Sequence, residues 1–347
     1  MASNTYNSDS FFKEVLCFKK EDVIRIVSQK DEYYYRKYIP KKNGIRILNC
    51  IKKDSELYKL QANLKRNLFD NIKKSKYAFG FVKGRSYKDF LLPHLNQGEG
   101  KMYYLRLDIE DFFGSISLEL LEDTLNKIIH ICDEINKPEL INIVKEIVTY
   151  EGKIPQGAVT SPDISNIIFR NIDERINGYC AKNMISYTRY ADDLLFSSKK
   201  PIYISKTISH ILGSYGFKLN MSKLRKSEDE ITLNGFVVGK NIRLSRSKLN
   251  EISAVLFLYD KISYENKDVQ NDKILKKNIT VNHNKVSEFL AQWESFSGDS
   301  EAGFSSEYEF IYYLKGMKAF LLCYCNGNLR IQKIVERINV ILKELEP

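Results

Sequence analysis

Apolar residues recur at helical spacing near the start of the chain and again over its last third. Residues 11–30 predict one or two short helices, and residues 57–72 predict a longer one with leucines along one face. Residues 117–149 also follow a helical period, as does the stretch that begins at Ser161. From Ser247 onward, a further apolar stripe predicts a C-terminal third built from helices.

Three other segments have the pattern of strands. Residues 33–48 predict a β-hairpin with a basic Asn-Gly turn, because that dipeptide favours the tight turn between two strands. Residues 102–107 predict a strand that ends at Asp108, and residues 187–198 predict two strands joined by an Ala-Asp-Asp turn. The whole pattern is that of a mixed α/β body followed by a helical cap.

Ser161, Pro162 and Asp163 are typical of a helix start. We expect the Ser161 hydroxyl to cap the helix, with proline in the first turn. Asp163 then lies near the positive end of the helix dipole, where a negative charge is stabilising.

Two adjacent carboxylates, Asp192 and Asp193, fall in the predicted turn between apolar strands. Taken alone, this pair is explained about equally well by a solvated turn, in which aspartate is common. Asp108 changes that interpretation, because three acids at neighbouring strand ends repel one another unless cations lie between them. Phosphoryl transfer uses two Mg²⁺ ions roughly 3.5–4 Å apart. Magnesium prefers oxygen ligands, with Mn²⁺ as a substitute, and the absence of histidine and cysteine from the cluster argues against zinc.

The composition and net charge of the chain indicate which classes of binding partner to expect. The chain has 347 residues, 43% of them hydrophobic, which suits a folded protein with two or three subdomains around a shared cleft. Its net charge of +10 favours nucleic acid or an anionic membrane surface as the partner. No apolar run has the length of a signal peptide or membrane span, and the six cysteines are scattered as reduced thiols would be. We therefore expect a cytoplasmic protein without a membrane partner.

Six short motifs then occur in the order in which bacterial reverse transcriptases carry them, over about residues 33–240. They are the hairpin with Lys42, Gly44 and Arg46, the segments Ala78–Ser86, Leu107–Phe113 and Pro155–Pro162, the turn Tyr190–Asp193, and Leu233–Phe236. Any one of these motifs is weak, but their order makes the combination specific. The chain therefore resembles a bacterial reverse transcriptase.

The resemblance implies an α+β fold of the right-hand polymerase type. An antiparallel palm sheet is expected to be backed by helices, and the thumb is expected to be helical. The expected division is an N-terminal helical extension over 1–30, fingers over 31–101, a palm over 102–240 and a thumb over 241–347. Helices between about 117 and 180 are expected to contribute to the fingers.

The resemblance also assigns roles to the acids. Asp108 and Asp192 resemble the metal-bridging carboxylates, with the backbone carbonyl of Ile109 as a further ligand. Asp193 resembles the less direct acid beside them. All three aspartates are expected to be catalytic.

Further residues resemble contacts to the nucleotide and to the nucleic acid. Expected nucleotide contacts are Lys42, Arg46, Phe113, Gln156, Gly157 and Lys223. Expected primer and template contacts are Gly235, Phe236, Arg243 and Arg246. Phe113 resembles the steric gate that excludes a 2′-hydroxyl, whereas Phe112 suits a core position. Gln156 and Gly157 resemble the loop beneath the nascent base pair, where glycine lets the backbone approach. Lys223 resembles a general acid for pyrophosphate; Arg225, Lys226 and a plain helix-face role are alternatives of similar weight.

Among reverse transcriptases, the chain is most similar to retron enzymes and their relatives in antiviral defence. Residues 90–94 keep the retron histidine as His94, and Leu233-Asn234-Gly235 stands where the retron pattern has Val-Thr-Gly. The resemblance implies an RNA-directed DNA polymerase that uses dNTPs to copy a structured non-coding RNA into DNA. It also implies a role in antiphage defence, with an effector protein of the same operon as a candidate partner.

Two other functions stay open. One is a template-independent or protein-primed nucleotide polymerase of a defence system, and the other is an inactive nucleic-acid-binding scaffold. The intact acidic trio and the Gln156-Gly157 pair argue against the scaffold.

RNA recognition is expected to come mostly from the helical C-terminal third. Basic residues there supply a sequence-independent attraction to phosphate, and aromatic residues can stack on unpaired bases. The aromatic candidates are Tyr259, Tyr264, Trp293, Tyr308, Tyr312, Tyr313 and Tyr324. More than half of them are expected to pack in the core of the same helices.

Overall fold

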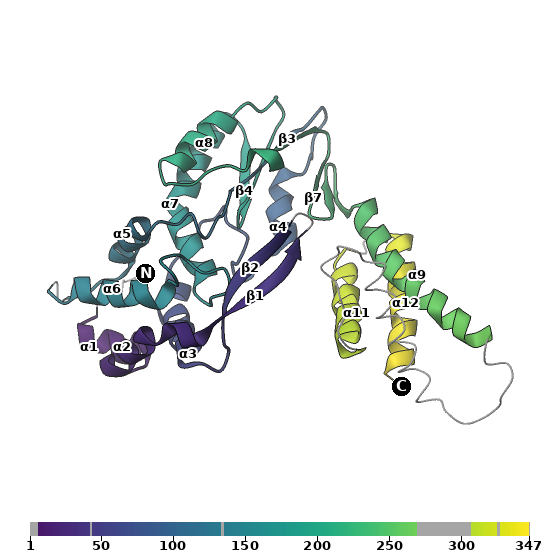
Figure 1. The fold of residues 1–347 in the computed structure, drawn as a ribbon. Coiled ribbons are helices and arrows are strands. Elements are labelled where there is room, and N and C mark those ends of the chain that lie inside the picture. The colour runs from purple at the N-terminus through teal and green to yellow at the C-terminus, as the bar shows by residue number, and fades with distance from the viewer. Residues whose placement is uncertain (1–5, 42–43, 133–134, 269–306, 325–326, 347) are drawn as a thin grey trace, which may run out of the picture. The chain divides into compact units, whose positions relative to one another are not determined.

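The computed structural model describes residues 6–41, 44–132, 135–268, 307–324 and 327–346 (Figure 1). The chain divides into two compact units. The first comprises residues 1–38, 47–231 and 238–242, and the second comprises residues 39–46, 232–237 and 243–347.

Short helices begin the first unit, as the sequence predicts. They are α1 (Ser8–Ser10), the π-helix η1 (Phe11–Leu16), α2 (Lys20–Ser28), the 3₁₀ turn η2 (Lys30–Tyr33) and α3 (Glu56–Asn67). Apolar residues of η1, α2 and α3 are buried against one another. The predicted helix over 57–72 is shorter than expected, because α3 ends at Asn67 and the separate 3₁₀ turn η3 (Phe69–Asn71) follows.

Strands β1 (Tyr34–Lys41) and β2 (Gly44–Ile51) form the predicted two-stranded hairpin. Its turn, residues 42–43, lies outside the described residues, and so does the expected contact residue Lys42.

A four-stranded antiparallel sheet forms the centre of the first unit. Its strands are β3 (Tyr103–Asp108), β4 (Ser186–Tyr190), β5 (Asp193–Ser198) and β6 (Arg225–Glu228), in the order β4-β5-β3-β6. The register pairs Asp108 with Asp193, and Tyr190 with Asp193 across the tight turn. The predicted strands at 102–107 and 187–198 are confirmed, and both acid-bearing strand ends lie at one edge of this sheet.

Helices and short turns surround this sheet. They are α4 (Tyr87–Leu91), η4 (Leu92–His94), α5 (Leu118–Ile128), α6 (Lys137–Val148), α7 (Ser161–Lys182), α8 (Ser205–Gly213) and η5 (Met221–Lys223). Both α4 and α7 pack on β4, and α8 packs on α7 (Figure 1). The helical period of residues 117–149 corresponds to two helices, α5 and α6, with a break between them. Helix α5 ends because Ile129 has an extended backbone conformation. Helix α6 then begins with Pro138 in its first turn, a position that suits proline.

The start of α7 also differs from the expected cap. Thr160 is the N-cap residue, and the Ser161 hydroxyl donates instead to the carbonyl of Pro155 at 2.6 Å. Asp163 does lie in the first turn, where Lys65 and Lys74 hold its carboxylate at 3.2 and 3.1 Å. The hydroxyl therefore ties the preceding loop to the helix, while the acid is neutralised by two lysines.

The second unit is mainly helical, which confirms the prediction for the described part of the C-terminal third. Strands β7 (Ile231–Leu233), β8 (Phe236–Val238) and β9 (Ile242–Leu244) form a three-stranded sheet whose residues are divided between the two units. The helices are α9 (Arg246–Asp268), α11 (Glu307–Leu322) and α12 (Leu329–Leu345). α11 and α12 lie side by side, and Tyr259 of α9 stacks on Phe310 of α11 at 5.6 Å between ring centroids (Figure 1).

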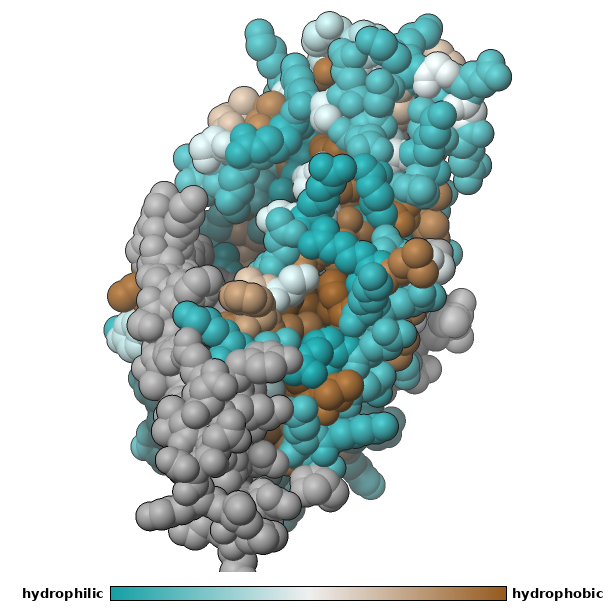
Figure 2. All heavy atoms as spheres, turned by 90° about the vertical axis from the view of Figure 1, so that its right-hand side faces the viewer, coloured by the Kyte–Doolittle hydropathy of each residue, from teal (hydrophilic) through white to brown (hydrophobic). Residues whose placement is uncertain are grey.

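Within the described residues, no helix has both the length and the apolar character needed to cross a membrane. Figure 2 shows hydrophilic side chains over most of the face that it draws, with apolar side chains between them.

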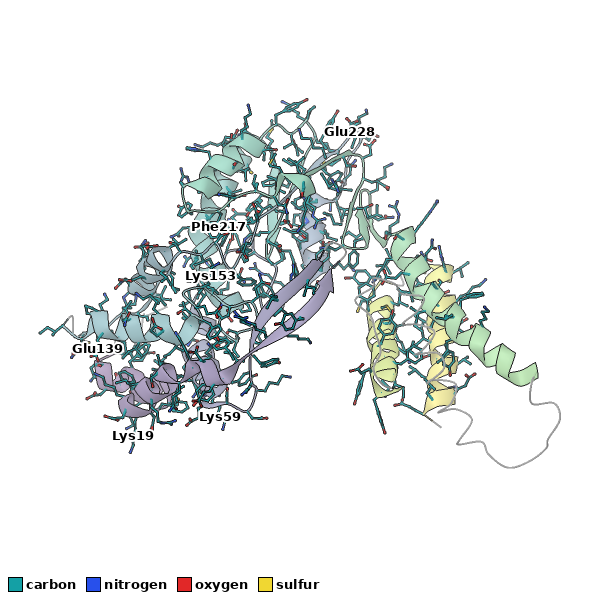
Figure 3. All side chains as sticks on the ribbon, viewed as in Figure 1. Lys19, Lys59, Glu139, Lys153, Phe217 and Glu228 are labelled. Carbon is teal, nitrogen blue, oxygen red and sulfur yellow. The ribbon has the colours of Figure 1, made fainter. Side chains whose placement is uncertain are left out.

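The core of the first unit is continuous from the N-terminal helices to the sheet. Phe217 lies in its interior, whereas Lys19 before α2, Lys59 on α3 and Glu139 on α6 are exposed (Figure 3). Phe112 packs on Phe169 and Phe217 at 4.9 and 6.4 Å between ring centroids, so an aromatic group lies directly behind the acid-bearing strand end. This packing gives the strand ends a rigid support.

Candidate active site

Two strand ends bring the acids together. Asp108 ends β3 and is 3% exposed, and Asp193 begins β5 opposite it. The Ile109 amide donates to the carbonyl of Asp192 at 3.0 Å, and the Asn220 amide donates to the carbonyl of Asp108 at 2.8 Å. These backbone bonds fix the positions of both acidic segments without using a carboxylate oxygen.

The turn itself has a constrained backbone. Ala191 has a φ of 55°, in the left-handed region that residues with a Cβ rarely adopt. Gly80 lies against it so closely that a Cβ on Gly80 would be 2.5 Å from the Ala191 nitrogen. Only glycine allows this approach, so residues 77–81 are held along the turn.

Burial and neighbouring charge act on Asp192 together. Burial raises the pKa of its carboxyl, and the charges of Asp193 and Asp108 raise it further. Lys223 places its Nζ 3.0 Å from each carboxylate oxygen of Asp108. An ammonium group thus already occupies a cation position on Asp108, and its side chain is 53% exposed.

Asp193 is paired with an arginine, whereas Asp108 is paired with a lysine. Arg106 binds both of its oxygens, with Nε at 2.8 Å from Oδ1 and a terminal nitrogen at 2.9 Å from Oδ2. No group of three acidic, histidine or cysteine side chains positioned to hold a metal occurs among the residues that the structure describes. Asp108, Asp192 and the Ile109 carbonyl nevertheless supply the hard oxygen donors that a divalent cation requires, beside a site that already attracts an ammonium.

Three further expected nucleotide contacts, Phe113, Gln156 and Gly157, lie among the described residues. Phe113 is half-buried, 6.2 Å from the ring of Phe81, whereas Phe112 is buried in the aromatic group described above. A Cβ on Gly157 would be 2.6 Å from the Asn49 carbonyl oxygen, so the loop lies directly against β2, and Gln156 beside it is exposed.

The remaining expected residues that the structure describes all belong to the second unit. Arg46 is exposed on β2, and Arg243 and Arg246 are exposed on β9 and at the first residue of α9. Gly235 and Phe236 follow β7, and the Phe236 ring is buried against Phe320 and Tyr324 of the same unit at 5.8 and 4.9 Å. Of the two alternatives to Lys223, Lys226 lies over the ring of Tyr203 and Arg225 is exposed on β6.

Two arginines were missed from the sequence. Arg106 pairs with Asp193, and the fully buried Arg189 pairs with Asp173 on α7. The sequence does contain a signal for both, since each arginine stands in a predicted strand with apolar neighbours, and a buried arginine needs a charged or polar partner. Nothing in the sequence alone says which acid that partner is.

The fold and the site together define a class. An antiparallel sheet carrying acids at adjacent strand ends, backed by helices and joined to a helical unit, is the palm and thumb of a right-hand polymerase.

Comparison with known proteins names the family. Residues 39–238 match the family described as reverse transcriptase (RNA-dependent DNA polymerase). The Retron Ec86 reverse transcriptase of Escherichia coli is 30% identical over 244 residues, covering 67% of this chain and 72% of that protein. The Retron Ec73 reverse transcriptase of the same organism is 30% identical over 269 residues, covering 72% and 79%. The chain belongs to the reverse transcriptase family and is a bacterial enzyme of the retron type, an RNA-directed DNA polymerase.

Among solved structures, apo telomerase from Candida tropicalis is similar at a TM-score of 0.42 and 12% identity, covering 96% of this chain and 75% of that one. Members of the reverse transcriptase family use divalent metal ions and an RNA template, so the general cofactor and partner expectations are confirmed.

Proposed function

We propose that Asp108, Asp192 and the Ile109 carbonyl hold two Mg²⁺ ions for nucleotidyl transfer, with Asp193 as the less direct acid. The observation that carries this proposal is the pairing of the buried Asp108 carboxylate with the half-buried Asp192 carboxylate at adjacent strand ends, where among the described residues it is Lys223, with its half-exposed side chain, that neutralises Asp108. When bound, the ions would activate the primer hydroxyl and stabilise the leaving pyrophosphate.

The other residues have positioning and proton roles in this proposal. Phe113 and Gln156-Gly157 shape the space for the sugar and the nascent base pair, and Arg46 and Lys42 bind the triphosphate. Lys223 exchanges its bond to Asp108 for one to the substrate and donates a proton to pyrophosphate. Support for Lys223 comes from its side chain, which reaches the acidic centre and keeps half of its surface in solvent.

Asp192→Asn tests the metal assignment. The change removes one negative charge and keeps the shape of the turn, so we expect polymerisation to fall by at least about 10³-fold while the melting temperature stays within a few degrees. Primer extension on a defined RNA template, with and without Mg²⁺, measures the first quantity. Activity within about tenfold of the unmodified enzyme would refute the assignment; extension without any template would instead favour a template-independent polymerase.

The domain division is part of the same proposal. We assign residues 31–101 to the fingers, 102–240 to the palm and 241–347 to the thumb, with residues 1–30 as an N-terminal extension and helices between about 117 and 180 contributing to the fingers. The match to the reverse transcriptase family over residues 39–238 supports a boundary near the start of the thumb.

We further propose that the thumb binds a structured non-coding RNA, which the enzyme copies into DNA in an antiphage defence system with an effector protein. The names of the retron relatives support this assignment. Tyr308 and Tyr312 on α11 are 76% and 71% exposed, and so they can stack on unpaired bases. Tyr259 is buried and has a packing role, whereas Tyr264 and Trp293 carry no described side chain.

Sequencing the RNA that co-purifies with the protein, expressed with its native neighbouring DNA, tests the RNA proposal. Wild-type protein should return one structured RNA, and Tyr308→Ala with Tyr312→Ala should weaken its binding by about 1–3 kcal/mol per stacked base. Tyr203→Ala, at an exposed tyrosine of the first unit, is the matched control. Recovery of only bulk cellular RNA, or an equal loss in the control, would contradict the proposal.

A further inference from the structure

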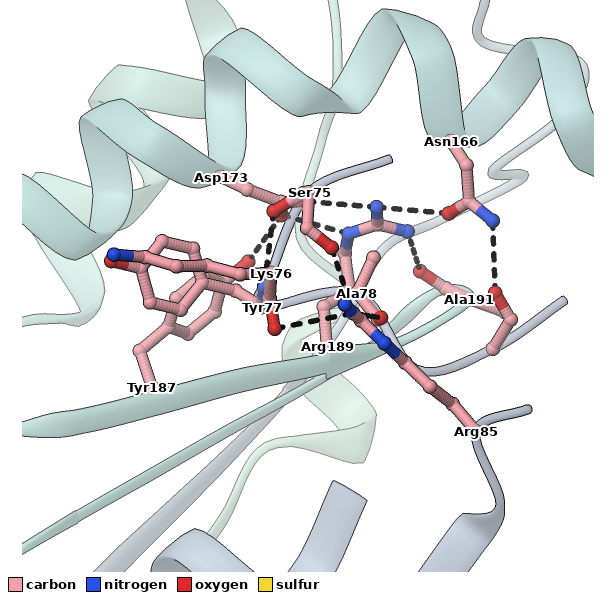
Figure 4. Close-up of polar contacts among 11 residues, drawn as sticks. Ser75, Lys76, Tyr77, Ala78, Arg85, Asn166, Asp173, Tyr187, Arg189 and Ala191 are labelled. Carbon is pink, nitrogen blue, oxygen red and sulfur yellow. Dashed lines mark hydrogen bonds and ion pairs between the residues drawn. The ribbon is translucent and has the colours of Figure 1, made fainter. Parts of the chain in front are cut away.

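Arg189 heads the large, fully buried side chains of the part of the chain that the structure describes, and it lies in β4 just before the acidic turn. Its guanidinium is shared among three partners (Figure 4). Nε and one terminal nitrogen bind the carboxylate of Asp173 at 2.8 and 2.9 Å, and the same terminal nitrogen donates to Oδ1 of Asn166 at 3.0 Å. The other terminal nitrogen donates to the carbonyl of Ala191 at 3.0 Å.

The network extends to the segment that lies along the turn. Asn166 uses its amide nitrogen to donate to the Gly80 carbonyl at 2.9 Å, so one side chain joins Arg189 to residues 77–81. The backbone of Arg189 adds two bonds, because its amide donates to the Tyr77 carbonyl and its carbonyl accepts from the Phe79 amide, both at 2.8 Å. Helix α7, the turn and this segment are therefore held by one residue (Figure 4).

The aromatic group behind the site is part of the same arrangement. The guanidinium lies over the ring of Phe169 at 4.7 Å and over that of Phe112 at 5.9 Å. Phe112 precedes the proposed sugar gate, Phe113. Lysine could not replace this geometry, because a single ammonium has no planar fork with which to reach a carboxylate, an amide and a carbonyl at once.

Stability alone is a weak explanation for such a residue. A buried ion pair gains little over well-packed apolar residues, because desolvation offsets most of its attraction. The network does fix the position of the acidic turn. Arg189 donates to the carbonyl of Ala191, which has the left-handed conformation and immediately precedes Asp192.

We propose that Arg189, with Asn166 and Asp173, is a positioning residue for catalysis that sets the location of the Asp192 carboxylate relative to Asp108 and to the segment 77–81. This inference rests on the proposed metal role of Asp192. Loss of the Ala191 bond lets the turn relax out of its left-handed conformation, and displacement of a reacting centre by about 1 Å costs roughly 10²-fold in rate.

Two variants test the role and one serves as the control. Arg189→Lys keeps the charge but loses the fork. Arg189→Met combined with Asp173→Asn removes both buried charges and leaves an acceptor for the Tyr187 hydroxyl, which binds Asp173 at 2.8 Å. Tyr187→Phe is the matched control, because it removes one hydrogen bond to the same buried aspartate and keeps the ring that packs on Tyr77 at 5.9 Å between centroids.

Three quantities are measured on folded protein well below its melting temperature. They are kcat and KM for a dNTP in primer extension, and the Kd of Mn²⁺ by electron paramagnetic resonance in a complex with primer, RNA template and a non-hydrolysable dNTP. We expect both Arg189 variants to lose about 10²-fold in kcat and to bind Mn²⁺ at least about fivefold more weakly, with KM changed less than about threefold. Tyr187→Phe should lose only thermal stability.

Values of kcat and Mn²⁺ affinity that match those of the control would overturn the proposal. Failure of the charge-free double variant to fold would also overturn it, because the network would then be needed for folding itself. Asp192→Asn is assayed alongside the variants. If Asp192→Asn stays active, the proposed metal site is wrong whatever Arg189 does, so the two failures can be told apart.

Discussion

Replacement of His94 by glutamine should remove much of the acid sensitivity of the fold. The imidazole of His94 is fully buried and contacts both strands of the acidic hairpin, with Nδ1 2.7 Å from the Ser197 hydroxyl on β5 and Nε2 2.7 Å from the Thr188 hydroxyl on β4. The backbone carbonyl of His94 accepts a hydrogen bond from the Tyr104 hydroxyl, and the ring centroids of Phe90 and His94 are 6.5 Å apart. These contacts offer hydroxyls and carbon and no carboxylate, so a protonated imidazole would have no counter-charge among them.

Burial lowers the pKa of His94 from its ordinary value of 6.5 to about 3. The unfolded chain therefore takes up a proton below about pH 6.5 that the folded protein refuses until about pH 3. The contribution of neutral His94 to the free energy of unfolding is complete above pH 6.5 and is lost as the pH falls between these two values. From pH 8 to pH 5 the loss is about 2 kcal/mol.

Urea unfolding followed by circular dichroism at pH 8, 6.5 and 5 measures this loss. Wild-type protein should lose about 2 kcal/mol more than His94→Gln across the range, although the variant starts from a lower stability at pH 8. His210→Gln, at an exposed histidine of α8, is the matched control for loss of a histidine and should keep the wild-type slope. Equal slopes in wild type and His94→Gln would show that His94 does not stay neutral in the folded protein, and would refute the reasoning.

Three further changes probe the acidic edge of the sheet. Phe113→Val should lower the preference for a dNTP over the matching rNTP, measured as a ratio of kcat/KM, while the control Phe112→Leu should lower thermal stability and leave that ratio unchanged. Lys223→Met should reduce kcat by about 10²-fold in single-turnover extension if the lysine is the general acid, and a change below about threefold would assign it a plain surface role. Arg106→Met should destabilise the protein by about 3–5 kcal/mol in urea unfolding because it removes the two-bond arginine partner of the buried Asp193 carboxylate, and Asp193→Asn in the same chain should recover most of the loss; no recovery would contradict the pairing.

The strands and the acidic edge followed from the sequence because their signals are local. An alternating apolar strand that ends in Asp108, and a tight turn with Asp192 and Asp193, need only the period of two and the turn preference of aspartate to be found. The order of the six motifs indicated the reverse transcriptase family. The prediction of two strand ends at one sheet edge then followed, since antiparallel neighbours place a turn beside the end of the next strand.

Other features depended on partners far away in the chain. The Ser161 hydroxyl has the composition of a helix cap, yet it donates to Pro155 because the preceding loop folds back onto α7. The break after α5 is set by an extended residue at Ile129 that no proline or glycine announces. Arg106 and Arg189 show that a buried charge can be suspected from its strand, while its partner, 87 or 16 residues away, is fixed only by the tertiary fold.

The buried polar groups of the palm fall into two kinds, and the difference bears on where a ligand can bind. Asp173 and Asp193 each accept two hydrogen bonds from an arginine, and the His94 ring is hydrogen-bonded at both nitrogens. The polar atoms of these groups therefore already have partners within the protein. Asp108 is as buried as they are, but the side chain of its neutralising partner Lys223 is 53% exposed, so the ammonium can move into solvent when another cation takes its place on Asp108. A divalent cation binds a carboxylate more strongly than an ammonium does, so it can displace Lys223 from Asp108 and free the lysine for substrate. The same cation could displace Arg106 from Asp193 only by breaking a two-bond ion pair between two largely buried side chains, which gives a physical reason why two adjacent aspartates in one turn would have different roles.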